Sequence, residues 1–177
     1  MTDIQQILAE RARVLAQPLN AHATDGELQL VVITLGDERY GVDSRWVQEV
    51  VPATRVTPLP GTAAYWAGLV NLRGRLVPLL DLNSFLVTLG VHAAQPPAPN
   101  ATSRIVLVSV AGLEVGLLAD DVSEVRRVAA SQIGPSLAES AGSSQPMIVG
   151  VTTDLLSVLD LEALLRDPQL AVKDDVI

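Results

Sequence analysis

The sequence predicts a mainly β fold built from two related units, each expected to be a small barrel. Short runs rich in Val, Leu and Ile recur at regular intervals with turn residues between them, which favours small barrels. Two sequence blocks recur in the same order in the two halves of the chain, which indicates related units. No strand–helix–strand alternation is present, so a parallel sheet is not expected.

The chain begins with a segment expected to precede the β fold. Residues 3–16 place Ile4, Ile7, Leu8 and Val14 at helical spacing with charged residues between them. We therefore expect residues 1–26 to form an N-terminal amphipathic helix, which ends before Pro18, and a polar connector.

The first half is expected to hold most of its residues in short strands. The alternating runs predict strands over residues 28–35, 39–42, 49–51 and 55–58. Helical turns are expected over residues 44–48, with Ser44 as the cap, and over 62–66, and a short helix over 82–89.

A tight hairpin is predicted at Arg73-Gly74. The runs GLVNL and RLVPLLDL flank this dipeptide, and Gly74 supplies the permissive backbone that a two-residue turn needs. Arg73 is then a charge at the tip of an apolar scaffold. That placement suggests recognition more than catalysis.

The second half repeats features of the first. Residues 91–100 contain three prolines, which predicts a surface connection, and strands are expected over residues 104–110, 113–119, 124–129, 147–152 and 155–159. Residues 40–50 (YGV and VQEV) match residues 115–125 (VGL and VSEV), and LLDL at 79–82 matches VLDL at 158–161. Asp81 and Asp160 are expected to cap short helices, the second over residues 161–165. Residues 168–177 are expected to form an acidic, flexible tail.

The composition disfavours several classes of partner. The net charge is −8, with 20 acidic and 12 basic residues, and no basic stripe is present, so we expect no nucleic-acid binding and no direct membrane binding. There is no Cys. No apolar run approaches the roughly 20 residues that span a bilayer, and residues 4–15 are not a signal peptide, so a cytoplasmic protein is expected.

Candidate catalytic groups are sparse. His22 and His92 are the only histidines, and neither has a second ligand at metal spacing. Asp120-Asp121 is the best carboxylate pair, and it serves either a cap and turn or, with a second carboxylate, an acid-dependent hydrolase. We therefore expect no enzyme, no metal and no cofactor.

The hairpin and the first strands together resemble a known family. The segments GELQLVVITLGDERYGVDSRWVQEVV and YWAGLVNLRGRLVPLLDL closely resemble the CheW-like chemotaxis coupling proteins over residues 27–165. The resemblance implies two small SH3-like five-stranded β-barrels, packed over a shared apolar core, in a domain of residues 27–167 with a connection near 91–100. It also implies a non-enzymatic adaptor that couples the cytoplasmic tips of chemoreceptors (methyl-accepting chemotaxis proteins) to the CheA histidine kinase.

The resemblance extends to partners and site residues. It implies a protein that is monomeric alone and assembles in receptor arrays by contacting the receptor tip and the kinase regulatory domain. A homologous coupling protein of another pathway, such as twitching motility, is the alternative. The implied receptor-binding residues are Val47, Glu49, Arg73 and Val125, and Gly68 and Gly74 are implied structural turn residues.

Each site residue also has an ordinary structural alternative. Val47 and Val125 are either interface residues or core strand residues, Glu49 could lie on a solvated strand face, and Arg73 could be a plain hairpin tip. Ser44 is polar where the family has an apolar kinase-contact position, which puts that contact in doubt.

Overall fold

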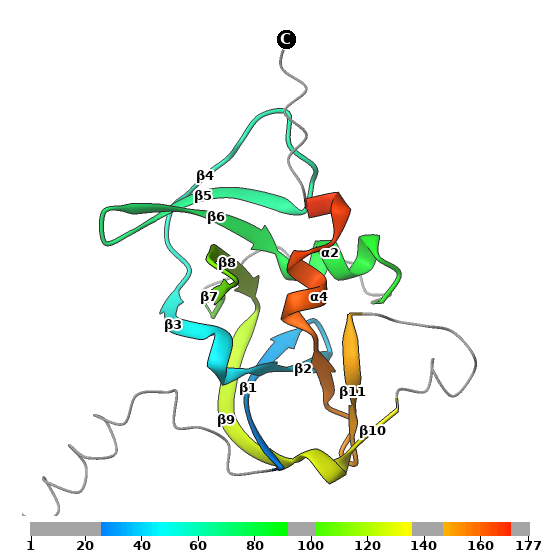
Figure 1. Cartoon of the computed structure of the whole chain (residues 1–177). Helices are drawn as coiled ribbons and strands as arrows, with labels where there is room; N and C mark the ends of the chain where they lie inside the picture. The colour runs from blue at the N-terminus through cyan, green and yellow to red at the C-terminus, as the bar shows by residue number, and fades with distance from the viewer. Residues whose placement is uncertain (1–25, 92–101, 136–146, 171–177) are drawn as a thin grey trace, which may run out of the picture.

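The computed structural model describes residues 26–91, 102–135 and 147–170, and these form two six-stranded sheets, called sheet A and sheet B (Figure 1). Sheet A contains, in spatial order, β10 (Ile133–Gly134), β11 (Ile148–Thr152), β12 (Ser157–Leu159), β2 (Glu38–Asp43), β1 (Glu27–Leu35) and β9 (Asp121–Ala129). Sheet B contains β3 (Val47–Pro52), β7 (Arg104–Val110), β8 (Leu113–Ala119), β6 (Arg75–Asp81), β5 (Trp66–Leu72) and β4 (Val56–Thr57). The helical elements are η1 (Ser44–Trp46), α2 (Leu82–Thr88), η2 (Ala130–Gln132), α4 (Leu161–Leu165) and η3 (Pro168–Leu170).

The strands do not divide between the sheets at residues 91–100. The contiguous stretch β3–β8 makes sheet B, whereas sheet A combines β1 and β2 with β9–β12. Residues 91–100 lie between α2 and β7, inside the stretch that builds sheet B. The chain passes between the sheets at η1 and at Asp120 instead. The expected count of five strands per unit is also wrong, because each sheet includes a two-residue strand at one edge, β4 or β10.

The repeated sequence blocks pair with each other across the two halves. The YGV block of β2 runs parallel to the VLD block of β12, with Gly41 opposite Val158. The VGL block of β8 runs parallel to the LLD block of β6 in the same way, with Gly116 opposite Leu79. A Cβ atom on Gly41 would lie 3.0 Å from Leu30 Cδ1, and one on Gly116 would lie 3.0 Å from Leu79 Cδ1. The glycines therefore leave room for the close packing of leucines.

The repeated V-x-E-V blocks each contain a β-bulge. The pairing of β3 with β7 shifts between Val47 and Glu49, so Gln48 is the additional residue. The pairing of β9 with β1 shifts between Val122 and Glu124, so Ser123 is the additional residue there. A bulge changes which side chains face the core on either side of it.

The Arg73-Gly74 turn has the geometry that its residues favour. Leu72 pairs with Arg75, so the loop has two residues, and both have positive φ (53° and 85°), as a type I′ turn requires. The Asn71 side-chain oxygen accepts a hydrogen bond of 2.8 Å from the Gly74 amide. The predicted hairpin is confirmed, and its tip is fixed by local hydrogen bonding.

Gly68 lies at a bulge near the base of this hairpin. Its φ is 138°, and a Cβ atom there would lie 2.1 Å from the Thr57 carbonyl oxygen. Only glycine fits so close to the backbone of β4.

The buried apolar residues form three clusters, one shared by the two sheets and one within each sheet. The central core takes residues from both sheets and from α2 and α4, including Ile33, Leu80, Phe85 and Leu164. Sheet B encloses its own cluster around Leu79, Ile105 and Leu107, and sheet A encloses one around Leu30, Val32 and Leu156. A mainly β fold of two sheets over a shared apolar core therefore forms as predicted.

The helix caps follow the sequence in two places and differ in a third. Asp81 accepts a hydrogen bond from the Ser84 amide at the start of α2, and Asp160 accepts one from the Ala163 amide at the start of α4, as predicted. The cap of η1 is Asp43, which accepts from the Arg45 amide, so the expectation for Ser44 is wrong. Ser44 is 3% exposed instead.

Two further expectations need correction. Residues 62–66 form an irregular turn that leads into β5, closed by a hydrogen bond from the Trp66 amide to the Ala63 carbonyl, and not a helical turn. Residues 168–170, which were expected to begin the flexible tail, form η3, with Leu170 in the central core. The N-terminal helix, His22, His92 and residues 171–177 lie outside the described residues. Within the described ranges, no helix is long and apolar enough to cross a membrane.

Candidate functional site

Arg73 and Glu49 form an ion pair between the hairpin tip and β3. The Arg73 Nη2 atom lies 3.0 Å from Glu49 Oε2. Since β3 and β5 lie near opposite edges of sheet B, the sheet must curl strongly to bring the tip and β3 together. The Arg73 side chain is 83% exposed and the Glu49 side chain 21%. The pair therefore presents a guanidinium to solvent above a carboxylate that is mostly covered.

The bulge at Gln48 determines where the residues of β3 point. Val47 is 5% exposed and packs in the central core. Of the two alternatives for Val47, an interface residue or a core strand residue, the structure therefore favours the core residue. After the bulge, Val51 packs against the sheet B cluster, and Val50 is 39% exposed. The sequence pattern does not mark Val50 as exposed, because a bulge leaves no signal in a simple alternation of apolar and polar residues.

Val125 lies on β9 of sheet A and is 51% exposed, so it is not a core residue. Val50 and Val125 occupy the same place in the two V-x-E-V blocks, and both are exposed. Of the four predicted receptor-binding residues, the contacts described in sheets A and B join only Arg73 and Glu49 directly.

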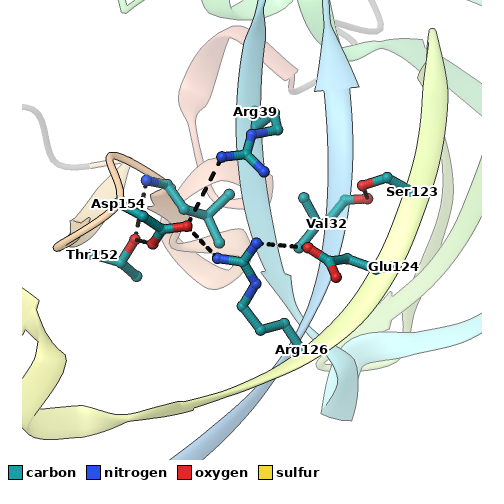
Figure 2. A network of polar contacts seen from close by, with 8 residues as sticks. Val32, Arg39, Ser123, Glu124, Arg126, Thr152 and Asp154 are labelled. Atoms are coloured by element: carbon teal, nitrogen blue, oxygen red, sulfur yellow. Dashed lines mark hydrogen bonds and ion pairs between the residues drawn. The ribbon is translucent and has the colours of Figure 1, made fainter.

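A second polar cluster lies on sheet A and was not predicted. Arg126 of β9 bonds Asp154, in the turn between β11 and β12, and lies 2.6 Å from Glu124 (Figure 2). Thr152 Oγ1 donates to Asp154 over 2.7 Å, and Arg39 Nη2 lies 3.9 Å from the same carboxylate. The repeat offered a signal for this cluster, since Glu124 matches Glu49.

The contacts within the cluster change the pKa values of Asp154 and Arg126. The hydrogen bond from Thr152 and the contact with Arg126 lower the pKa of Asp154 to about 2. The hydrogen bonds to Glu124 and Asp154 raise the pKa of Arg126 above its usual value. Asp154 therefore stays ionised well into the acidic range.

The carboxylates of Asp120 and Asp121 do not share one centre. Asp120 Oδ2 accepts a 2.6 Å hydrogen bond from the Gly36 amide, and so ties the β1–β2 turn to the passage between the sheets. Asp121 begins β9 and pairs with Thr34 of β1. Asp120 lies at a bend and Asp121 lies in a strand, so the predicted turn is confirmed and the predicted cap is wrong.

Comparison with known proteins points to one family. The family model described as "CheW-like domain" matches residues 29–169. The chain is 35% identical to "Chemotaxis protein CheW" of Rhizobium meliloti over 115 residues, which cover 65% of this chain and 70% of that protein. It is 31% identical to "Chemotaxis protein CheW" of Klebsiella aerogenes over 152 residues, which cover 84% of this chain and 87% of that protein.

A solved structure gives the same result. The "scaffolding protein TtCheW" of Thermoanaerobacter tengcongensis superposes with a TM-score of 0.67 and 27% sequence identity, over 85% of this chain and 94% of that one. The match includes strands of both sheets, since it extends over most of the chain. Family model, relatives and structure agree, and the chain belongs to the CheW-like family of chemotaxis coupling proteins.

Proposed function

We propose that this chain is a non-enzymatic adaptor that couples the cytoplasmic tips of chemoreceptors to the CheA histidine kinase. The observation that carries the receptor contact is the Arg73 guanidinium, which is 83% exposed at the tip of a rigid turn and paired with Glu49. Membership of the CheW-like family supplies the class of function.

The chemistry of the hairpin tip suits a helical partner. Receptor tips are helical hairpins, and a helix laid against a partly apolar surface is a common mode of recognition. A guanidinium has five donors in a planar fork, so Arg73 has donors left for a partner after pairing with Glu49. Each contact is small, and the many linked copies in an array would make such contacts effective.

The remaining site assignments belong to the same proposal. Glu49 holds Arg73, Val125 supplies an exposed apolar contact, and Val47 supports the surface from the core. Gly68 and Gly74 keep the hairpin in shape. Ser44 is buried, so a kinase contact at this point would have to be made by its neighbours.

We also infer that each sheet is a small SH3-like barrel and that the protein works in the cytoplasm, monomeric until it joins a receptor array. Support for the barrels comes from the two contacts that draw distant parts of a sheet together, Arg73 with Glu49 in sheet B and Arg126 with Asp154 in sheet A. The alternative pathway, twitching motility, uses the same kind of coupling. Loss of swimming chemotaxis, without loss of pilus-driven movement, in a deletion strain would decide for chemotaxis.

The receptor contact can be tested by substitution at the hairpin. We expect Arg73→Gln to weaken binding of a receptor cytoplasmic fragment by about tenfold, the effect of a lost charge-assisted hydrogen bond, and Arg73→Glu to weaken it further. Arg75→Gln is the matched control, because Arg75 lies on the same hairpin and pairs with Glu114 at 2.9 Å. Titration calorimetry measures binding, and circular dichroism checks the fold. Unchanged binding by folded Arg73→Glu would remove Arg73 from the site.

A further inference from the structure

Arg73 lies at a backbone position that is unfavourable for arginine. Its φ is 53°, in the left-handed region that residues with a Cβ atom adopt only at a cost in free energy. The first position of a two-residue type I′ turn favours Asn, Asp or Gly, and an Asn-Gly pair suits such a turn well. In this chain the Asn comes two positions earlier, at residue 71, and Arg takes the first turn position. A strained residue at an exposed tip points to a functional requirement for its side chain.

The Asn71 side chain holds the turn in this geometry. Leu72 pairs with Arg75 across the hairpin, so Asn71 is the second residue before the turn. Its Oδ1 atom accepts a hydrogen bond of 2.8 Å from the Gly74 amide. That amide belongs to the peptide plane between Arg73 and Gly74, so the bond restrains ψ of Arg73 and φ of Gly74 together. Without the bond, the turn is freer to adopt the negative φ values that arginine prefers.

The direction of the Arg73 side chain depends on this backbone geometry. The side chain is 83% exposed, so the surrounding residues give it little packing. Its ion pair with Glu49 joins Nη2 and Oε2 over 3.0 Å, and an ion pair with so exposed a partner restrains that side chain only weakly. The backbone of the turn therefore has a large part in determining where the guanidinium lies relative to β3.

We propose that Asn71 is a positioning residue for the receptor contact. Its hydrogen bond to the Gly74 amide keeps the left-handed turn, and the turn keeps the Arg73 guanidinium beside Glu49, with its remaining donors available to the partner. The inference rests on the proposed function of Arg73. It adds a residue that holds the recognition group and is not a recognition group itself. It also explains how Arg is tolerated at a turn position that suits Asn.

The test is a double-mutant cycle in the whole chain, with a receptor cytoplasmic fragment titrated in a calorimeter. We expect Asn71→Ala to weaken binding by about three- to tenfold, the range of one hydrogen bond. Asn71→Asp should recover most of the loss, since a carboxylate oxygen still accepts from the Gly74 amide. In an Arg73→Gln background, Asn71→Ala should change the affinity by less than about twofold, because Asn71 acts through the guanidinium.

A further variant tests the strain at the turn. Arg73→Asn gives the turn the favoured Asn-Gly pair, so we expect a melting temperature about 1–4 °C higher than that of wild type. Its receptor binding should be at least as weak as that of Arg73→Gln, because the guanidinium is lost. Circular dichroism checks the fold of each variant and measures the melting temperature.

The outcomes separate this inference from the receptor contact itself. Unchanged binding by Asn71→Ala, no recovery by Asn71→Asp, or an equal loss with and without Arg73→Gln would overturn the positioning role and leave the Arg73 contact standing. Unchanged binding by Arg73→Gln would instead remove the receptor contact on which the inference rests. A melting temperature that Arg73→Asn does not raise would overturn the argument from strain.

Discussion

At the scale of single residues, each sheet has an ion pair that joins a strand to a turn, and the positions of the acidic and the basic residue are reversed between the two sheets. In sheet B the acid, Glu49, comes from strand β3 and the base, Arg73, from the hairpin tip. In sheet A the base, Arg126, comes from strand β9 and the acid, Asp154, from the turn. Each pair joins the V-x-E-V strand to the turn between two later strands. An Arg at the exposed tip in one sheet and a carboxylate in the other give the two ends different chemistry for partners.

Asp154 makes stability depend on pH in a narrow acidic window. Its pKa falls from 3.8 to about 2 on folding, so its ionised form stabilises the protein above pH 4, and this contribution is lost as the pH falls through 2. We expect wild type to lose stability faster than Asp154→Asn between pH 4 and pH 2. Urea unfolding at several pH values measures this. Parallel loss in both proteins would show that Asp154 contributes nothing to the slope.

At the scale of elements, the sequence predicted the features that depend on neighbouring residues and did not predict those that depend on distant ones. The Arg73-Gly74 turn and the caps at Asp81 and Asp160 depend on residues at most three positions away, and each forms as predicted. The burial of Val47 depends on a bulge, and a bulge shifts the alternation without a compositional mark. The contact between Arg73 and Glu49 depends on the curl of a whole sheet, so neither residue indicated the other.

The cap of α4 matters because the helix is only five residues long. Its leucines pack in the central core, and Asp160 satisfies the Ala163 amide. We expect Asp160→Ala to cost about 1 kcal/mol and to lower the melting temperature by roughly 2–4 °C. Asp160→Asn should recover most of the loss, because the amide oxygen still accepts. Thermal unfolding followed by circular dichroism measures both, and an equal loss in the two variants would exclude capping as the cause.

At the scale of the whole molecule, each half of the chain contributes one hairpin to the sheet that is built mainly from the other half. Strands β3–β6 of the first half build sheet B around the hairpin β7–β8 of the second, and β9–β12 build sheet A around β1–β2. The sequence showed the repeat but not this exchange of hairpins. The same spacing in each half is compatible with two separate sheets, one per half, and with sheets that exchange hairpins. Which hairpin enters which sheet is decided by packing between segments far apart in the chain.

The exchange predicts how fragments behave. Residues 27–90 alone lack β7 and β8, the two strands that lie between β3 and β6 in sheet B. Without them β3 has no neighbouring strand, and β6 pairs only with β5. We expect neither this fragment nor residues 102–170 to fold as a monomer, and an equimolar mixture to recover the strand signal in circular dichroism. Ultracentrifugation checks that the recovered species contains one copy of each. A stable monomer of either fragment would show that a half folds without its borrowed hairpin.

The parallel pairing of β2 with β12 and of β6 with β8 also has an evolutionary meaning. A shorter ancestral chain with a single repeat would have had a hairpin to donate and a gap to fill. Two such chains could have completed each other by domain swapping, a low-cost route to a dimer. Fusion of the two genes would then have turned an assembly that depended on concentration into a single folded unit. Such a fusion would have left the two ends free to diverge, and in this chain one turn carries Arg73 and the other Asp154.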